Sequence, residues 1–63
     1  MNDLSELELE ERFARDCEQD DCRRFMWVVV EEGVIQEEWI GKNSHWVRRI
    51  HPDTTVDLVM VTN

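Results

Sequence analysis

Hydrophobic and polar residues follow two different periods along this chain, and the change comes near residue 22. Over residues 4–20 the apolar side chains recur every three or four positions, which is the spacing of a helix with one apolar face. Four short runs follow, at 24–31, 34–40, 45–51 and 56–62, most of them rich in β-branched and aromatic residues and separated by turn-forming residues. The pattern predicts one helix followed by a three- or four-stranded antiparallel meander.

The expected helix begins at one of two capping boxes. Ser5 with Glu8, and Asp3 with Glu6, each place a capping side chain three residues before a glutamate. Acids at positions 20 and 21 oppose the helix dipole and predict that the helix ends near residue 20. The expected apolar face consists of Leu7, Leu9, Phe13, Ala14 and Cys17.

The segment FMWVVV, residues 25–30, is the most hydrophobic part of the chain. Its β-branched and aromatic composition predicts a well-buried strand with Trp27 in the core. Alternation in the last two runs places Trp46 on the opposite face of its strand from His45. It also places Val56 on the apolar face of the final strand.

Residues 34–40, VIQEEWI, fit two structures. As a strand their alternation is poor, and a short helix that carries Ile35 and Trp39 on one side is the alternative. We favour the strand because Gly33 and Gly41 bracket the segment as turns.

These elements predict an α+β fold in one small domain, residues 1–63, with the acidic amphipathic helix packed on the sheet. A chain of this length buries only about 60% of the surface that its unfolded form exposes, so its core is marginal. Such domains often depend on a metal, a disulfide or a partner subunit.

The net charge of −8 is concentrated at one end of the chain. Residues 1–22 hold nine acids against two arginines, a net charge of −7, whereas residues 23–63 are nearly neutral at −1. This charge disfavours direct binding to nucleic acid or to an anionic membrane and attracts basic partners. A basic patch made of Arg23, Arg24, Lys42, Arg48 and Arg49 is too small and too dispersed to reverse that expectation.

The first residues, MNDLSELELEE, contain neither a basic start nor an apolar stretch, so we expect no signal peptide. No run of apolar residues approaches the length of a membrane span. A cytoplasmic, reducing location is therefore expected, which argues against a disulfide between Cys17 and Cys22.

Cys17 and Cys22 with His45 and His51 form the pattern C-x4-C…H-x5-H, which could hold zinc as a structural staple. Six residues of strand would separate the two histidines by about 20 Å, which is too wide for one ion. No cofactor is therefore expected, and zinc remains the alternative.

The chain offers no obvious catalytic group. Ser44 and His45 are neighbours in sequence and would point apart on a strand, as would Glu37 and Glu38. There is no glycine-rich phosphate loop. We expect a protein that is not an enzyme.

The acidic helix is the strongest functional candidate. Carboxylates spaced along a rod can imitate the phosphates of a nucleic acid and occupy a basic groove. Exposed tryptophan near charged residues is typical of a binding hot spot. The expected partner-binding residues are Glu8, Glu11, Glu18, Asp20, Asp21, Trp39 and Trp46.

The leading hypothesis is a non-enzymatic protein-binding module, an inhibitor or modulator that masks a basic, nucleic-acid-binding surface of a larger protein. Small acidic inhibitors from phages and antitoxin-like proteins have this size and charge, which is an analogy of composition alone. Two alternatives come from other classes: a small zinc-stapled interaction module, and a homodimeric structural protein that associates through a sheet edge or a tryptophan surface.

Overall fold

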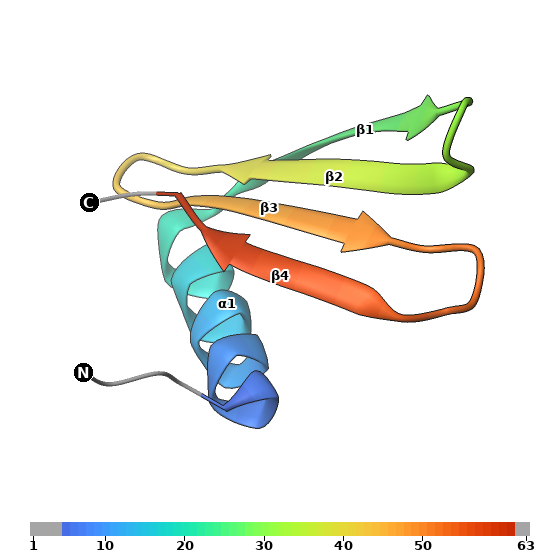
Figure 1. Cartoon of the computed structure of the whole chain (residues 1–63). Coiled ribbons are helices and arrows are strands. Elements are labelled where there is room, and N and C mark those ends of the chain that lie inside the picture. Colours follow the sequence, from blue (N-terminus) through green and yellow to red (C-terminus); the bar gives the residue numbers. More distant parts are fainter. Residues whose placement is uncertain (1–4, 62–63) are drawn as a thin grey trace.

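The computed structural model describes residues 5–61 and has one helix and four strands. The α+β fold expected from the sequence, one N-terminal helix on an antiparallel sheet, is confirmed (Figure 1). The elements are α1 (Glu6–Asp20), β1 (Arg23–Val29), β2 (Val34–Ile40), β3 (His45–Ile50) and β4 (Val56–Met60).

Helix α1 begins at the capping box formed by Ser5 and Glu8. The Glu8 amide donates to Ser5 Oγ at 3.2 Å, and the Ser5 amide donates to Glu8 Oε1 at 3.0 Å, so two free amides at the helix start are satisfied. The second candidate start depends on Asp3, which lies outside the described residues. The helix ends at Asp20, as expected, because Asp21 adopts a left-handed conformation with φ of 52°.

The sheet is a simple meander in which the strands pair in the order β1-β2-β3-β4. Residues 34–40 form a strand rather than the alternative short helix. This strand pairs with β1, where Val34 lies opposite Val29, and with β3, where Trp39 lies opposite Trp46. This register gathers both tryptophans on one face, with Met60 of β4 next in the row.

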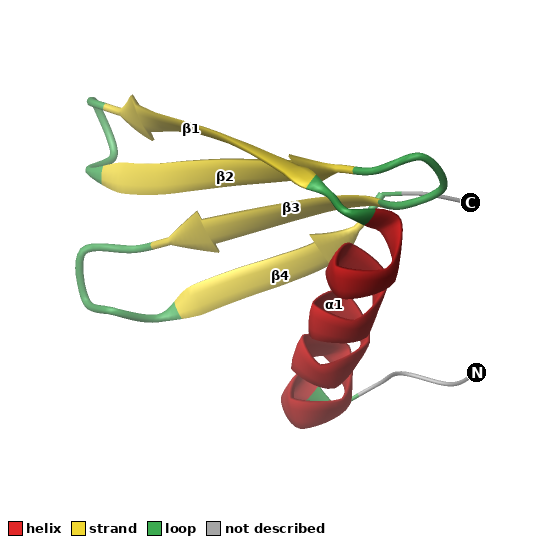
Figure 2. Cartoon of the chain, turned by 180° about the vertical axis from the view of Figure 1, so that it is seen from behind, coloured by secondary structure: helices red, strands yellow, loops and turns green. Residues whose placement is uncertain are grey.

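Helix α1 covers only one end of that face. The ring of Phe13 packs edge-on against two tryptophan rings of the sheet. Its centroid lies 5.3 Å from that of Trp39 and 5.6 Å from that of Trp46. Figures 1 and 2 show the helix crossing the strands steeply near the β2–β3 turn, with its N-terminal end beyond the β4 edge. The other end of the same face is left open.

The core is correspondingly small. Among the described residues only Val34, Glu37 and Trp46 are buried, and no residue of α1 is. The prediction that residues 25–30 form a well-buried strand with Trp27 in the core is wrong: Trp27 is 42% exposed and Met26 57% exposed. The reason is position: β1 lies at the edge of the sheet, and the register places Trp27 on the face that the helix does not cover, whereas Met26 lies on the helix's face beyond its reach.

Candidate binding groove and acidic helix

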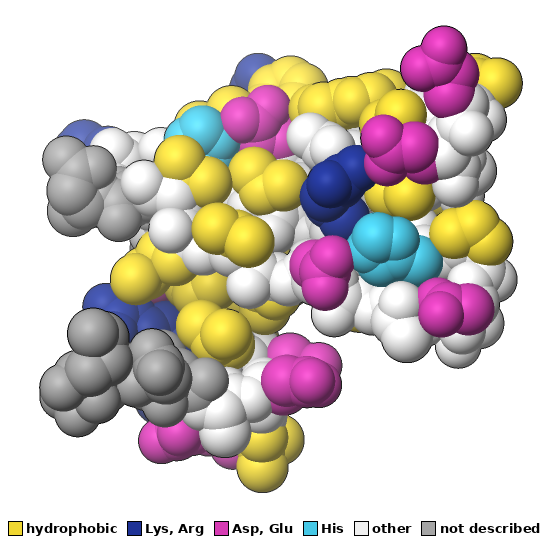
Figure 3. Space-filling view, in the orientation of Figure 1, with side chains coloured by type: hydrophobic (Ala, Val, Ile, Leu, Met, Phe, Trp, Pro, Cys, Tyr) yellow, Lys and Arg dark blue, Asp and Glu magenta, His cyan; other side chains and the backbone are white. Residues whose placement is uncertain are grey.

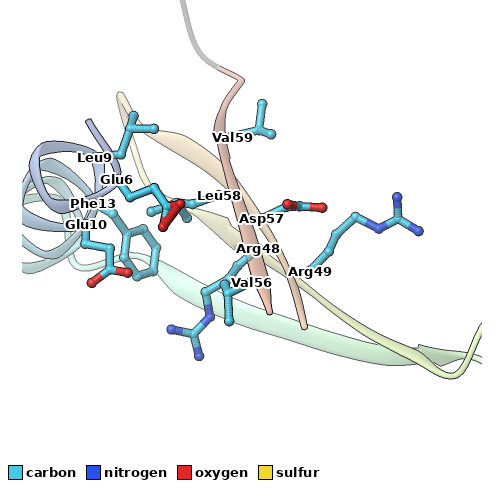
Figure 4. A pocket seen from close by; sticks show the side chains of 10 residues that line it. All are labelled: Glu6, Leu9, Glu10, Phe13, Arg48, Arg49, Val56, Asp57, Leu58 and Val59. Carbon is cyan, nitrogen blue, oxygen red and sulfur yellow. The ribbon is translucent and has the colours of Figure 1, made fainter. Parts of the chain in front are cut away.

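An open groove of about 610 Å³ lies between α1 and β4 (Figure 4). Leu9 and Phe13 extend into it from the helix, and Val56 and Leu58 line it from β4. Alternation along β4 places these last two side chains on the helix side of the sheet. The remaining lining residues are Glu6, Glu10, Arg48, Arg49, Asp57 and Val59. Figure 4 shows that Arg49, Asp57 and Val59 lie on the face of the sheet away from the helix.

Two carboxylates stand at the rim of this apolar groove. Glu6 and Glu10 are exposed, and neither forms an ion pair within residues 5–61. Both lie on the same side of the helix as Phe13, seven and three residues before it. Neither glutamate is among the site residues expected from the sequence, although their spacing from Phe13 is a signal that places them on its side of the helix.

Two of the expected partner-binding acids have structural roles inside the molecule. Glu8 caps the helix, and its hydrogen bonds with Ser5 lower the pKa of its carboxyl group. Asp20 accepts a hydrogen bond from the amide of Asn43 at 2.6 Å, which lowers its pKa and ties the helix end to the β2–β3 turn. These carboxylates stabilise the fold whether or not they also contact a partner.

The other three expected acids, Glu11, Glu18 and Asp21, are exposed. The outer side of the helix is not purely acidic, because Arg15 lies four residues after Glu11 and three before Glu18. The other helix arginine, Arg12, forms an ion pair with Asp16 at 3.8 Å. Helix α1 as a whole still carries seven acids against two arginines, a net charge of −5.

The two tryptophans expected at a binding surface have different environments. Trp46 is fully buried, with 0% of its surface exposed, so the expectation that it contacts a partner is corrected. It is covered by Phe13, and its indole donates to Asp16 Oδ2 at 3.3 Å. Trp39 is half-buried, and its indole donates to Glu37 Oε1.

Glu37 is a buried carboxylate held by two arginines. Its side chain is 4% exposed and lies 2.8 Å from Arg48 Nε and 3.6 Å from Arg24 Nη1. Its neighbour Glu38 points to the opposite face, where it pairs with His45. The two carboxylates therefore do not form a catalytic pair, in keeping with the alternation of the strand.

The four candidate zinc ligands do not come together. His45 pairs with Glu38, and His51 pairs with Asp57 at 2.7 Å; Figure 3 shows each imidazole beside an acidic side chain. Within residues 5–61 no three His, Cys, Asp or Glu side chains are grouped closely enough to hold a metal ion.

Cys17 and Cys22 are free thiols at the end of the helix. The left-handed turn at Asp21 brings Cys22 back toward Cys17, and the Cys22 amide donates to the Cys17 carbonyl at 3.2 Å. Burial, together with the neighbouring Cys22 thiol, raises the pKa of Cys17 to about 12. Such a thiol is a poor nucleophile, because the thiolate is the reactive form.

No helix within residues 5–61 has the length and apolar character needed to cross a membrane. Comparison with known proteins found no family model, no curated protein and no solved structure that matches this chain.

Proposed function

We propose that this protein is a non-enzymatic binding module that masks a basic segment of a larger protein. The observation that carries the proposal is the groove between α1 and β4, which combines an apolar floor with exposed carboxylates at its rim (Figure 4). A segment with one apolar anchor flanked by lysine or arginine would bury the anchor against Phe13 and Leu58. Its basic groups would meet Glu6 and Glu10.

The charge of the helix supports the same partner. A net charge of −5 on α1, beside a nearly neutral sheet, accelerates encounter with a basic protein and orients it toward the helix. A surface that binds nucleic acid is basic, so it offers the kind of segment that this groove would take. In this proposal the protein acts as an inhibitor or modulator by occupation alone, without chemistry of its own.

The test uses a synthetic peptide probe with a central leucine between lysines, and a control peptide in which glutamates replace the lysines. Fluorescence anisotropy should show binding of the basic peptide alone, weakening as salt rises from low to physiological concentration. Glu10→Lys should weaken binding by about fivefold or more, since it replaces an attraction at the groove rim with a repulsion.

Glu31→Lys is the matched control, because Glu31 is exposed in the β1–β2 turn and the substitution changes the net charge equally. If both variants weaken binding by the same small factor, only the overall charge matters and the groove is not the site. A third variant, in which Glu11 and Glu18 both become Lys, separates the outer side of the helix from the groove. Proteins captured from cell extract by the wild type and lost with Glu10→Lys would identify the natural partner.

A further inference from the structure

We propose that two copies of this chain associate through the free edge of β1, forming one continuous sheet around a two-fold axis. The proposal is independent of the function proposed above, because β1 and the groove lie at opposite edges of the sheet. It accounts for the exposed apolar residues of β1, which neither the helix nor the groove explains.

Strand β1 has the properties of a pairing edge. Its central side chains are apolar and exposed: Phe25 by 47%, Met26 by 57%, Trp27 by 42% and Val28 by 57%. An edge strand presents unpaired backbone amides and carbonyls, and natural proteins usually protect such an edge with charges, proline or a bulge. The centre of β1 contains none of these; its charged residues are confined to its first two positions.

The other edge, β4, is a poorer candidate. Helix α1 crosses it and projects beyond it (Figure 1), and Asp57 places a carboxylate near the start of the strand. The second copy of an acidic protein would also have to approach the helix that carries most of its negative charge. At the β1 edge the nearest charges on the strand itself are arginines, and the N-terminal half of α1 projects past the far edge (Figure 1).

The sequence of β1 is complementary to itself in one antiparallel register. A two-fold axis at Met26 pairs Met26 with its own counterpart and sets Phe25 opposite Trp27 of the second copy, twice. Arg24 then lies opposite Val28 of the second copy, so no like charges face each other. Aromatic pairs across strands are among the stabilising cross-strand contacts, and like charges directly opposite are destabilising.

This register identifies the occupant as a second copy rather than an unrelated strand. In this register both arginines of β1 face valines and its two aromatic side chains face each other, so the strand's own sequence supplies partners without any like-charge contact. The resulting sheet has eight strands, and one acidic helix crosses each half of it. The N-terminal halves of the two helices, which carry four of the seven acids of each α1, project past the two outer edges of this sheet (Figure 1).

Sedimentation equilibrium over a range of protein concentrations tests the proposal. The wild-type chain should sediment as a reversible dimer. Met26→Glu should weaken association by about tenfold or more, because it places two carboxylates against each other on the two-fold axis. Val30→Glu, with the same charge change at a position 84% exposed just beyond β1, should leave association unchanged.

A wild-type chain that stays monomeric at every concentration, or a dimer that Met26→Glu leaves intact, would overturn the proposal. Circular dichroism shows whether Met26→Glu still folds. If it does not, Val28 provides a second comparison, because Val28→Lys faces Arg24 of the second copy and should weaken the dimer. Val28→Glu faces the same arginine and should not; equal effects of the two substitutions would reject this register.

Discussion

The burial of strands β1 and β3 is the reverse of what their sequences suggest. β1, RRFMWVV, has five consecutive apolar residues, yet every residue before Val29 is exposed. β3, HWVRRI, is half charged or polar, yet it holds the fully buried Trp46 and has no exposed residue. The two strands belong to the same sheet and differ in place: β3 has a neighbour on each side and the helix above it, whereas β1 has one neighbour and open solvent.

The comparison shows that burial in this fold depends on the topology more than on the hydrophobicity of the segment. One helix of 15 residues crosses the sheet steeply and can cover only the corner beneath it. Apolar residues outside that corner, such as Phe25 and Val28, remain exposed on opposite faces of the sheet. A small domain with so much uncovered apolar surface is suited to association.

The sharpest test of this difference compares one tryptophan from each strand. Trp46→Ala removes the side chain that Phe13 and the helix pack against and should destabilise the fold by about 3 to 5 kcal/mol. Trp27→Ala removes a side chain that is already 42% exposed and should cost about 2 kcal/mol or less. Urea unfolding of both variants, at a concentration where the chain is monomeric, measures the two values, and equal losses would contradict the assigned core.

The same contrast extends to buried and exposed carboxylates. Glu37→Ala removes the ion-pair partner of Arg48 and the acceptor of the Trp39 indole, and it should cost about 2 to 3 kcal/mol. Glu31→Ala, in the exposed turn after β1, should change stability by less than about 0.5 kcal/mol. Denaturant unfolding of the two variants provides the check, and a neutral Glu37→Ala would show that the buried ion pairs contribute nothing.

The type and order of the elements could be predicted because local chemistry determines them. Ser5 and Glu8 mark the helix start, and Gly33 and Gly41 bracket β2 as turns, as the structure shows. Alternation alone gave the correct faces of the later strands, including the opposite orientations of Glu37 and Glu38. These features depend on residues within a few positions of each other.

Burial and the binding groove could not be predicted, because both depend on where the helix lies over the sheet. Nothing in the segment FMWVVV distinguishes an edge strand from a central one. Trp46 was expected at a surface and proved to be the centre of the core, since the steep crossing of α1 places Phe13 directly over it. Glu6 and Glu10 became groove residues for the same reason.

A smaller effect is expected where the helix end meets the inner strands, at Gly41. A methyl group there would come within 2.8 Å of the Asp20 side chain and of the Cys22 sulfur. Gly41→Ala should therefore cost about 1 to 2 kcal/mol by displacing Asp20 from the β2–β3 turn. Thermal unfolding gives the loss of stability, and an unchanged melting temperature would show that the junction can yield without cost.

The smallest expected effect is a pH dependence of stability that arises at the corner of the sheet covered by α1. Burial and the nearby Cys22 thiol raise the pKa of Cys17 from 9.0 to about 12, so the folded state holds this proton more tightly than the unfolded state. The resulting stabilisation is complete below pH 9 and is lost as the pH rises through about 12. The chain contains no tyrosine, and comparison with Cys17→Ala separates the contribution of Cys17 from those of Cys22 and Lys42. Urea midpoints measured between pH 8 and 11 should fall for the wild type and fall less for Cys17→Ala; identical slopes would place this thiol in solvent, like the side chains of β1.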